Sequence, residues 1–458
     1  MTRVVDGELL QDAARRAHRY LADLGNRSVA PAAGAVAGLE QLGGVLPEDG
    51  LAPSKVLALL DDAGSPATIA SAGGRYFGFV TGGVLPAALA AGWLGSAWDQ
   101  NAFSTMTSPA GAAIEPIALG WLKEVLALPH ECAGAFVTGA TMANFTALAA
   151  ARHGVLARAG WDVDADGLFG APPVTVVVGE EVHASLFKVI ALLGLGRERV
   201  VSVPADAQGR MRVDALPALT GPTIICAQAG NVNSGAFDPI ADICDRAHAD
   251  GAWVHVDGAF GLWAAAAPAY AGLVNGVQAA DSWATDAHKW LNVSYDSGIA
   301  LVRDAASLRA AMSMSAAYLP TGETREPFHY TPDSSRRARG IEIWAALLSL
   351  GRLGLADLVA GNCAMASRIA QALRDAGHQV LNEVVLNQVL VSFGDGDTTN
   401  RVVAALQEEG TCWCGPTVWK GRAAMRVSVS SWATTDEDVA DSIGAILKVA
   451  AEITGSRN

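Results

Sequence analysis

Short apolar runs alternate with helix-like segments from residue 134 onward. The runs occupy residues 135–137, 174–178, 200–203, 223–226, 253–256, 282–285 and 299–302. Segments with helical character lie between them, among them residues 142–152, 184–193 and 240–249. This alternation predicts an α/β sheet with helices on both faces, whose ligands bind at the ends of the strands.

The regions on either side of this alternation have a different pattern. Residues 1 to about 60 predict two helices joined by an Ala/Pro/Gly-rich connector, an arm that packs on something else, such as a second subunit. Residues 303 to about 340 are polar and carry Pro320, Gly322, Pro327 and Pro332, which predicts an ordered but mobile loop. A helix at 341–353, strands at 380–392 and 425–430, and a helix at 436–453 predict a small α+β domain.

We therefore expect three parts in the chain. They are an N-terminal helical arm and pocket segment (1–103), a large ligand-binding domain (104–338) and a small C-terminal domain (339–458).

The composition narrows the class of protein. Of 458 residues, 51% are hydrophobic and 17% are charged, which is typical of a globular protein. The net charge of -14 argues against nucleic acid and anionic membrane as partners. We expect no signal peptide, because the first 24 residues are charged, and the apolar stretches 84–95 and 261–269 are too short to span a bilayer. Six scattered cysteines without metal-site spacing predict a reduced, cytoplasmic protein with no metal centre.

The segment 281–298 contains Lys289, the candidate nucleophile of the site. Lys289 follows the apolar run 282–285, and Trp283 and Trp290 flank it in the sequence. Such neighbours predict partial desolvation, which disfavours the ammonium and frees the amine as a nucleophile. On this segment alone, an ordinary surface lysine beside a strand is an equal alternative.

A run of small residues at 138–144 follows the first strand and opens a helix. Ala140 and Thr141 leave backbone N–H groups pointing outward at a helix N-terminus, which suits a phosphate. The run is neither a dinucleotide fingerprint nor a Walker motif. Small residues are also common in strand-to-helix turns that bind nothing.

Three further strand ends carry polar side chains. His183 is suited to stacking on a planar ring or moving a proton, with helix capping as the alternative. Asp257 is suited to holding a cationic ring nitrogen, and Ala259 leaves room for a flat ring, with an Asp-Gly turn as the alternative. Asn231 and Asn233 are placed to hold the Asp257 carboxylate or a ligand hydroxyl, or simply to form an Asn/Gly turn.

Together these strand ends supply an anion cradle, a flat-ring contact, a carboxylate and a nucleophilic lysine. A phosphate, an aromatic ring with a protonatable nitrogen, and an aldehyde that takes a lysine are the parts of pyridoxal 5′-phosphate. The aromatic and glycine-rich segment 76–103 suits the wall of a ligand pocket, although core packing explains it equally well.

At these motifs the chain resembles the group II pyridoxal-phosphate decarboxylases, which act on aromatic amino acids, histidine and glutamate. The resemblance runs from about Tyr76 to the C-terminus and is most specific at 281–298, 256–260, 235–239 and 425–430. It implies the aspartate aminotransferase fold (fold type I), with a mostly parallel seven-stranded sheet in the large domain. It also implies a homodimer with shared active sites.

The resemblance implies a role for each site residue. Lys289 would form a Schiff base with the cofactor, Asp257 would pair with the ring nitrogen, and His183 would stack on the ring. The residues near the phosphate would be Ala140, Thr141 and His288. Asp286 stands where some relatives have asparagine, and a carboxylate close to a phosphate would repel it.

The run 316–320 resembles the mobile catalytic loop of these enzymes. The tyrosine of that loop protonates the substrate carbon after CO2 leaves, whereas relatives with phenylalanine there yield aldehydes. Tyr318 therefore predicts simple decarboxylation of an L-amino acid to the amine. An aldehyde synthase or other lyase, an aminotransferase and a non-enzymatic binding protein on the same fold are the alternatives.

Aromatic side chains near the expected pocket favour an aromatic or bulky apolar substrate. The substrate contacts that we expect are Phe79, Thr81 and Trp98, with Asn101 and Phe103 supplied by the partner subunit. No convincing arginine or lysine pair for a side-chain carboxylate is present, so glutamate is disfavoured.

Overall fold

The larger of two β-sheets has seven strands in the order β1-β7-β6-β5-β4-β2-β3. The computed structural model describes residues 7–314 and 325–455. The strands are β1 Ala133–Val137, β2 Thr175–Gly179, β3 Val201–Val203, β4 Thr223–Gln228, β5 Trp253–Asp257, β6 Ser282–Asp286 and β7 Gly298–Val302. β7 is antiparallel to both of its neighbours, and all other neighbours pair in parallel. The seven predicted strands and the mostly parallel sheet are confirmed.

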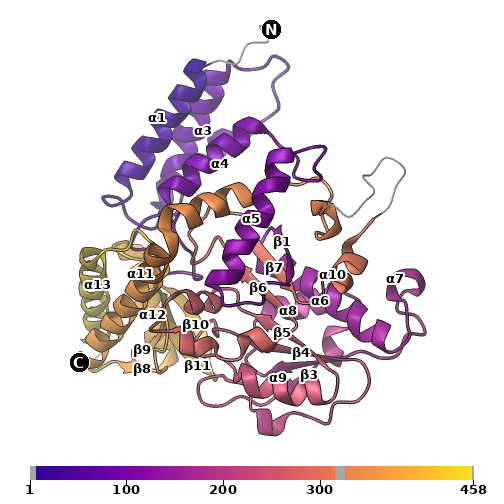
Figure 1. Cartoon of the computed structure of the whole chain (residues 1–458). Coiled ribbons are helices and arrows are strands. Elements are labelled where there is room, and N and C mark those ends of the chain that lie inside the picture. The colour runs from indigo at the N-terminus through magenta and orange to yellow at the C-terminus, as the bar shows by residue number, and fades with distance from the viewer. Residues whose placement is uncertain (1–6, 315–324, 456–458) are drawn as a thin grey trace.

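Helices cover both faces of this sheet, which explains why its strands are apolar along their whole length. Successive residues of one strand contribute to opposite cores: Val177 packs in the core with α5 (Pro109–Val125) and α9 (Ile240–Ala249). Its neighbour Val176 packs in the core with α6 (Ala140–Arg158), α8 (Ala184–Leu192) and α10 (Ala305–Met312). Figure 1 shows these helices wrapped around the sheet.

The smaller sheet is antiparallel and has the order β10-β11-β9-β8. Its strands are β8 Gln379–Val380, β9 Gln388–Ser392, β10 Gly415–Trp419 and β11 Arg422–Ser428. Helices α12 (Gly396–Glu409) and α13 (Asp436–Gly455) pack on it. The single predicted strand at 380–392 is wrong, because a turn with a positive φ at Val384 divides it into β8 and β9. The predicted cap of α13 is confirmed at Thr435, whose Oγ1 accepts a hydrogen bond from Asp438 N.

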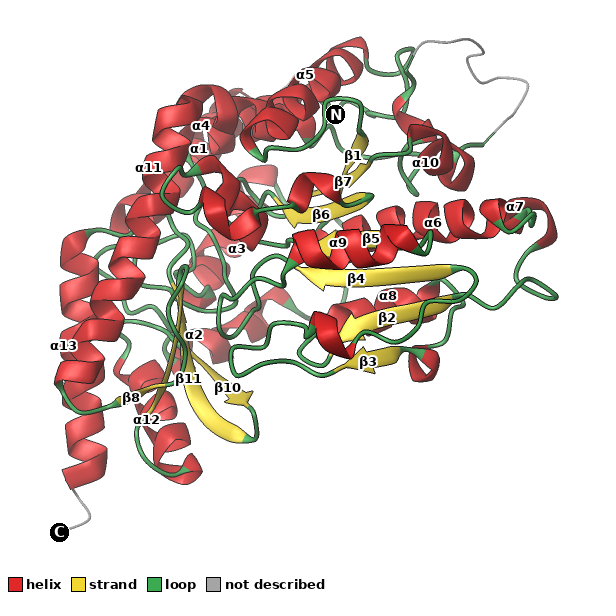
Figure 2. Ribbon diagram, turned by 60° about the horizontal axis from the view of Figure 1, so that its bottom comes forward, coloured by secondary structure: helices red, strands yellow, loops and turns green. Residues whose placement is uncertain are grey.

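The carboxyl ends of the parallel strands point toward the smaller sheet. Figure 2 shows the arrowheads of β2, β4 and β6 on the side of the molecule where β10 and β11 lie. The region that binds ligands in sheets of this kind is therefore enclosed between the two sheets.

Helix α11 (Gly340–Asp375) connects the two parts of the molecule. It bends at Gly351, whose φ of 60° and ψ of -174° lie outside the helical region, a conformation that a residue without a Cβ adopts at little cost. Among the described residues, α11 alone is long and apolar enough to cross a membrane by length and composition. It packs on α4 (Pro86–Trp98), α5 and β9, as core helices with such a composition do.

The N-terminal arm contains α1 (Gly7–Asp23) and α3 (Pro53–Ala67), as predicted. The connector between them is not a plain loop but carries the short helix α2 (Ala33–Ala37) and a 3-10 turn (Gly38–Leu42). The predicted loop at 303–340 also needs correction, since α10 occupies its first part. A short helix, α7 (Val163–Asp166), follows α6 in the chain. The three-part domain division stays a prediction.

Candidate active site

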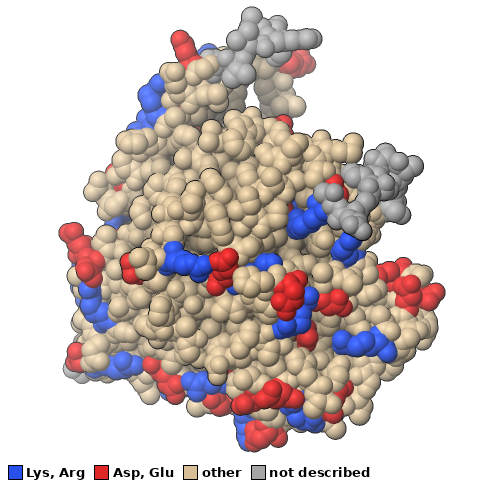
Figure 3. Space-filling view, viewed as in Figure 1, with Lys and Arg blue, Asp and Glu red and all other residues tan. Residues whose placement is uncertain are grey.

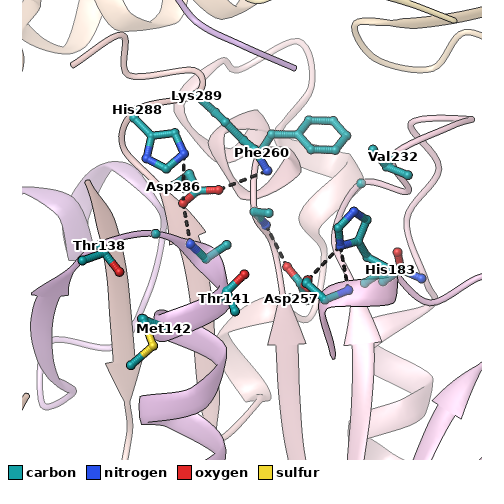
Figure 4. A pocket seen from close by; sticks show the side chains of 16 residues that line it. Thr138, Thr141, Met142, His183, Val232, Asp257, Phe260, Asp286, His288 and Lys289 are labelled. Carbon is teal, nitrogen blue, oxygen red and sulfur yellow. Dashed lines mark hydrogen bonds and ion pairs between the residues drawn. The ribbon is translucent and has the colours of Figure 1, made fainter. Parts of the chain in front are cut away.

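A cavity of about 340 Å³ lies at the carboxyl ends of the parallel strands. This volume is at the lower end of the range of about 300–1,000 Å³ that is usual for ligand pockets. The cavity is lined by every residue that we expected to contact the cofactor except Asn231 and Asn233: Ala140, Thr141, His183, Asp257, Ala259, Asp286, His288 and Lys289. Figure 4 shows side chains converging on one space from the ends of β5 and β6 and from the starts of α6 and α8, namely Thr141, His183, Asp257, Asp286, His288 and Lys289.

Lys289 lies in the turn that follows β6. Its Nζ is 3.0 Å from Asp286 Oδ2, so the amine forms an ion pair within the cavity wall. The two tryptophans that flank it in sequence are completely buried, but neither lines the cavity. Trp290 Nε1 instead donates to Asn362 Oδ1, which anchors the turn to α11. The tryptophans therefore fix the position of the lysine more than they cover its amine.

The segment that precedes α4 packs against the backbone of the lysine turn. A Cβ at Gly82 would lie 1.8 Å from the Lys289 carbonyl oxygen, so only glycine allows this approach. Gly83 N donates to Asn292 Oδ1 at 2.7 Å, and Trp432 N donates to the same oxygen at 2.9 Å. Asn292 thus holds two distant segments against the turn that presents Lys289.

Asp257, the last residue of β5, presents a nearly buried carboxylate to the cavity. Oδ1 accepts a hydrogen bond from Ala259 N at 3.1 Å, and Oδ2 accepts one from Asn144 Nδ2 at 3.0 Å. These two donors fix the orientation of the carboxylate in the cavity wall. The side chain is therefore positioned to pair with a ring nitrogen.

A buried hydrogen-bond chain continues behind Asp257. Asn144 Oδ1 is 2.8 Å from His255 Nε2, and His255 Nδ1 is 2.9 Å from Ser282 Oγ. Because the Asn144 amide already donates to Asp257, its oxygen must accept, which assigns the proton of a neutral His255 to Nε2. Burial lowers the pKa of His255 to about 3, in agreement with a neutral ring.

Asn144 and His255 were missed by the sequence reasoning. Both lie in segments that the motifs had already marked, Asn144 in the run 138–144 and His255 two residues before Asp257. The available signal was a polar side chain in an otherwise apolar strand, since buried polar groups require partners.

His183 is both a helix cap and a wall of the cavity. Its Nδ1 accepts a hydrogen bond from Ser185 N at 3.3 Å at the start of α8, which is the capping alternative. The ring nevertheless lines the cavity. Burial lowers the pKa of His183, against an opposing contribution from Asp257, so the imidazole is neutral near pH 7.

The N-terminus of α6 closes the other end of the cavity. Gly139 supplies no side-chain cap, and a Cβ there would lie 3.2 Å from His288 Cε1. The Ala140 N–H donates to Asp286 Oδ1 at 2.5 Å. His288 Nδ1 accepts from Ser297 N at 3.1 Å, and burial lowers the pKa of this histidine. The region predicted to receive a phosphate therefore holds a carboxylate, as Figure 4 shows.

Asn231 and Asn233 do not hold Asp257, and that part of the prediction is wrong. Asn231 Oδ1 accepts from Asn233 N at 2.9 Å and closes the Asn/Gly turn, which was the alternative reading. Asn233 Oδ1 accepts from Thr417 Oγ1 at 2.8 Å. A contact of Asn233 with a ligand hydroxyl stays a prediction.

None of the expected substrate contacts lines the cavity. Phe79 is exposed, Thr81 is buried and Trp98 is half-exposed at the end of α4. Asn101 Oδ1 accepts from Arg336 N, and the Phe103 ring stacks on Phe328. Their contact with substrate stays a prediction. Tyr318 lies outside the described residues.

Arg426 on β11 is a further residue that the sequence reasoning did not single out. Its Nη1 is 3.5 Å from Asn233 Oδ1, and burial lowers its pKa. The guanidinium is close enough to lower the pKa of His183. The side chain is partly exposed and does not line the cavity, and within residues 7–314 and 325–455 no carboxylate forms an ion pair with it.

A sheet of this order, with a lysine, an aspartate and a histidine at its carboxyl edge, defines the class of pyridoxal-phosphate enzymes with fold type I. Comparison with known protein families narrows the assignment within this class. The conserved domain of pyridoxal-dependent decarboxylases matches residues 74–394, and the chain belongs to that family. It is a pyridoxal-phosphate-dependent amino acid decarboxylase.

Curated relatives and solved structures agree with this assignment. The chain is 29% identical over 399 residues to tryptophan decarboxylase 1 of Oryza sativa subsp. japonica, covering 78% of this chain and 76% of the relative. It is 30% identical over 391 residues to L-2,4-diaminobutyrate decarboxylase of Rhizobium meliloti, covering 80% and 76%. The crystal structure of Oryza sativa TDC with PLP and tryptamine superposes with a TM-score of 0.90 at 23% identity, covering 99% of both chains.

The residues of the cavity fit pyridoxal phosphate. Lys289 offers an amine for the aldehyde, Asp257 a carboxylate for the ring nitrogen, and α6 a helix N-terminus, free of side-chain caps of its own, for the phosphate. Asp286 is the single discordant group, because it adds a negative charge at the phosphate end.

Proposed function

We propose that the enzyme converts an L-amino acid with an aromatic or bulky apolar side chain to the amine and CO2. The convergence of Lys289, Asp257 and His183 on one cavity carries this proposal. The names of several relatives, among them tryptophan decarboxylase 1 and the aromatic-L-amino-acid decarboxylase of Bacillus atrophaeus, support the substrate class. Phe260, Val232 and Met142 give the cavity apolar walls.

Bound pyridoxal phosphate accepts the electron pair that the departing carboxylate leaves on the substrate. The chain supplies the groups that direct this chemistry. Lys289 would hold the cofactor through its aldehyde, since its amine lies in the cavity wall. Asp257, held by Asn144 and Ala259, keeps a proton on the ring nitrogen. His183, neutral and fixed by Ser185, would cover the cofactor ring and exclude water from it.

We also propose that Arg426 orients the carboxylate of the substrate. A guanidinium matches the geometry of a carboxylate, and its desolvation strengthens the pairing. The substrate's leaving carboxylate would otherwise enter the site without a cationic partner. Tyr318 is proposed to deliver the proton that completes the amine.

The proposed assembly is a homodimer. Large apolar side chains are exposed along α4, namely Trp93, Leu94 and Trp98. Figure 3 shows a broad area without charged side chains over α4 and α5. Exposed apolar areas of this kind mark interfaces. A partner on this face would bring its own Asn101 and Phe103 near the site, where the single chain lacks substrate contacts.

Sedimentation equilibrium tests the dimer. Leu94→Arg on α4 is expected to give a monomer, because a charge would be buried at the interface. Leu192→Arg, a matched change at an exposed leucine at the end of α8, is expected to leave the mass unchanged. A monomeric wild-type protein would refute the assembly.

We further propose a cytoplasmic location, supported by the six unpaired and buried cysteines.

Product analysis under air tests the reaction itself. A panel of aromatic and aliphatic L-amino acids and 2,4-diaminobutyrate is incubated with the holoenzyme, and amine, aldehyde and hydrogen peroxide are measured together. Amine without peroxide from an aromatic or bulky apolar substrate supports the proposal. Aldehyde with peroxide favours the alternative, to which a relative named phenylacetaldehyde synthase of Arabidopsis thaliana lends weight.

The same assay tests the role of Tyr318. Tyr318→Phe is expected to divert product from amine toward aldehyde, because the proton donor is lost. Tyr330→Phe is the control, since Tyr330 is buried against Arg325 and lies outside the cavity. An unchanged amine yield in Tyr318→Phe would show that another group delivers the proton.

A further inference from the structure

The carboxylate of Asp286 occupies the anion-binding end of the cavity. Asp286 is the last residue of β6 and is 2% exposed. Oδ1 accepts from Ala140 N at 2.5 Å, and Oδ2 is 3.0 Å from Lys289 Nζ. One carboxylate therefore contacts both the amide that faces a phosphate and the amine that takes the cofactor aldehyde.

The position of this carboxylate is fixed by its own backbone. Asp286 N donates to the Ala259 carbonyl at 3.0 Å, and the Trp263 indole donates to the Asp286 carbonyl at 3.0 Å. These bonds fix the backbone from which the carboxylate projects into the cavity. Since α6 has no side-chain cap of its own, Asp286 serves as the anion at its N-terminus.

The phosphate of the cofactor conflicts with this arrangement. It is a dianion, and the helix N-terminus that attracts it already neutralises the charge of Asp286. Lys289 also pairs with the same carboxylate. His288, the remaining basic neighbour at 3.6 Å, has a pKa lowered by burial and adds little positive charge near pH 7.

We propose that Asp286 is an internal anion that competes with the cofactor phosphate for the Ala140 amide. It holds this amide in the cofactor-free protein and weakens cofactor binding. This role is separate from the choice of amino acid substrate and holds for any reaction that the bound cofactor supports.

Equilibrium titration of the cofactor-free protein tests the proposal. Asp286→Asn keeps an acceptor for the Ala140 amide and removes the charge. It is expected to bind pyridoxal 5′-phosphate more tightly by on the order of 10- to 100-fold, the range expected for relieving a repulsion between partly screened charges a few ångströms apart. Pyridoxine 5′-phosphate, which has the phosphate but no aldehyde, should gain by a similar factor.

Pyridoxal, which lacks the phosphate, separates this role from a general effect on the site. The affinity of Asp286→Asn for pyridoxal should stay within about threefold of the wild-type value. Such a difference corresponds to less than about 0.7 kcal/mol in binding free energy, which is too small to indicate a relieved repulsion. Asp281→Asn is the matched control, because Asp281 directly precedes β6 but contacts His248 and Val254 away from the cavity. Its affinities for all three ligands should equal those of the wild type.

Two results would overturn the proposal. Unchanged or weaker binding of both phosphate ligands by Asp286→Asn would show that Asp286 only positions Ala140 and Lys289. Equal tightening of pyridoxal would show that the gain does not come from the phosphate. If Asp286→Asn does not fold, as judged by its thermal midpoint, Asp286→Ser removes the same charge and is subject to the same two criteria.

Discussion

The hydrogen-bond chain from Asp257 to His255 predicts a large loss of stability when its central residue is removed. Asn144→Leu keeps the volume of the side chain but leaves Asp257 Oδ2 without its donor and the His255 Nε2 proton without its acceptor. Asn144 and His255 are completely buried, so water cannot replace the partner that His255 loses, whereas Asp257 faces the cavity and can be hydrated there. The unpaired buried group at His255 costs about 1–3 kcal/mol in the free energy of unfolding.

Urea unfolding of the cofactor-free protein, followed by tryptophan fluorescence, measures this loss without a contribution from cofactor binding. Thr146→Val is the matched control. It is a buried polar residue on the same helix whose hydroxyl donates only to the Met142 carbonyl, and its removal is expected to cost about 1 kcal/mol or less. If Asn144→Leu is no more destabilising than Thr146→Val, the chain behind Asp257 does not exist as inferred.

Three further predictions follow from the site. Lys289→Ala should abolish decarboxylation, because no other amine lines the cavity among the described residues; residual turnover above about 1% of the wild type, measured as CO2 release, would contradict the assignment. The pKa of His255 is lowered to about 3, so the unfolded chain binds a proton that the folded protein does not. Wild-type stability relative to His255→Gln should therefore fall as the pH decreases from about 6.5 toward 4, by about 1.4 kcal/mol per pH unit, and a pH-independent difference in urea denaturation would refute a buried neutral ring. Arg426→Gln should raise the KM for the amino acid by about tenfold or more while the cofactor affinity stays unchanged, and an unaltered KM in steady-state kinetics would remove Arg426 from the substrate site.

Local sequence pattern was sufficient for most of the sheet and for the main site residues. Short apolar runs predicted all seven strands of the larger sheet, because strands buried on both faces need apolar residues throughout. The edge strand β10 was missed, since only its two end residues, Gly415 and Trp419, are buried and Pro416 interrupts the pattern. Helix α10 was missed because its surroundings are polar and rich in proline and glycine.

The sequence by itself determined that Lys289, Asp257, His183 and Ala140 belong to one site. Each follows or ends a strand, and the carboxyl ends of parallel strands meet at one edge of a sheet, so order along the chain is enough to bring them together. Their chemical character then indicated the cofactor.

Only the tertiary structure decided which side chains are partners. Asn144 lies 113 residues from Asp257, and Ala140 lies 146 residues from Asp286, yet each pair is joined by a hydrogen bond. Such pairing depends on strand order, register and side-chain direction, none of which has a local period in the sequence. For that reason the sequence was enough to identify the main residues of the site. Only the fold showed that the Asp286 carboxylate bonds to the N-terminus of α6, where the sequence predicted a phosphate.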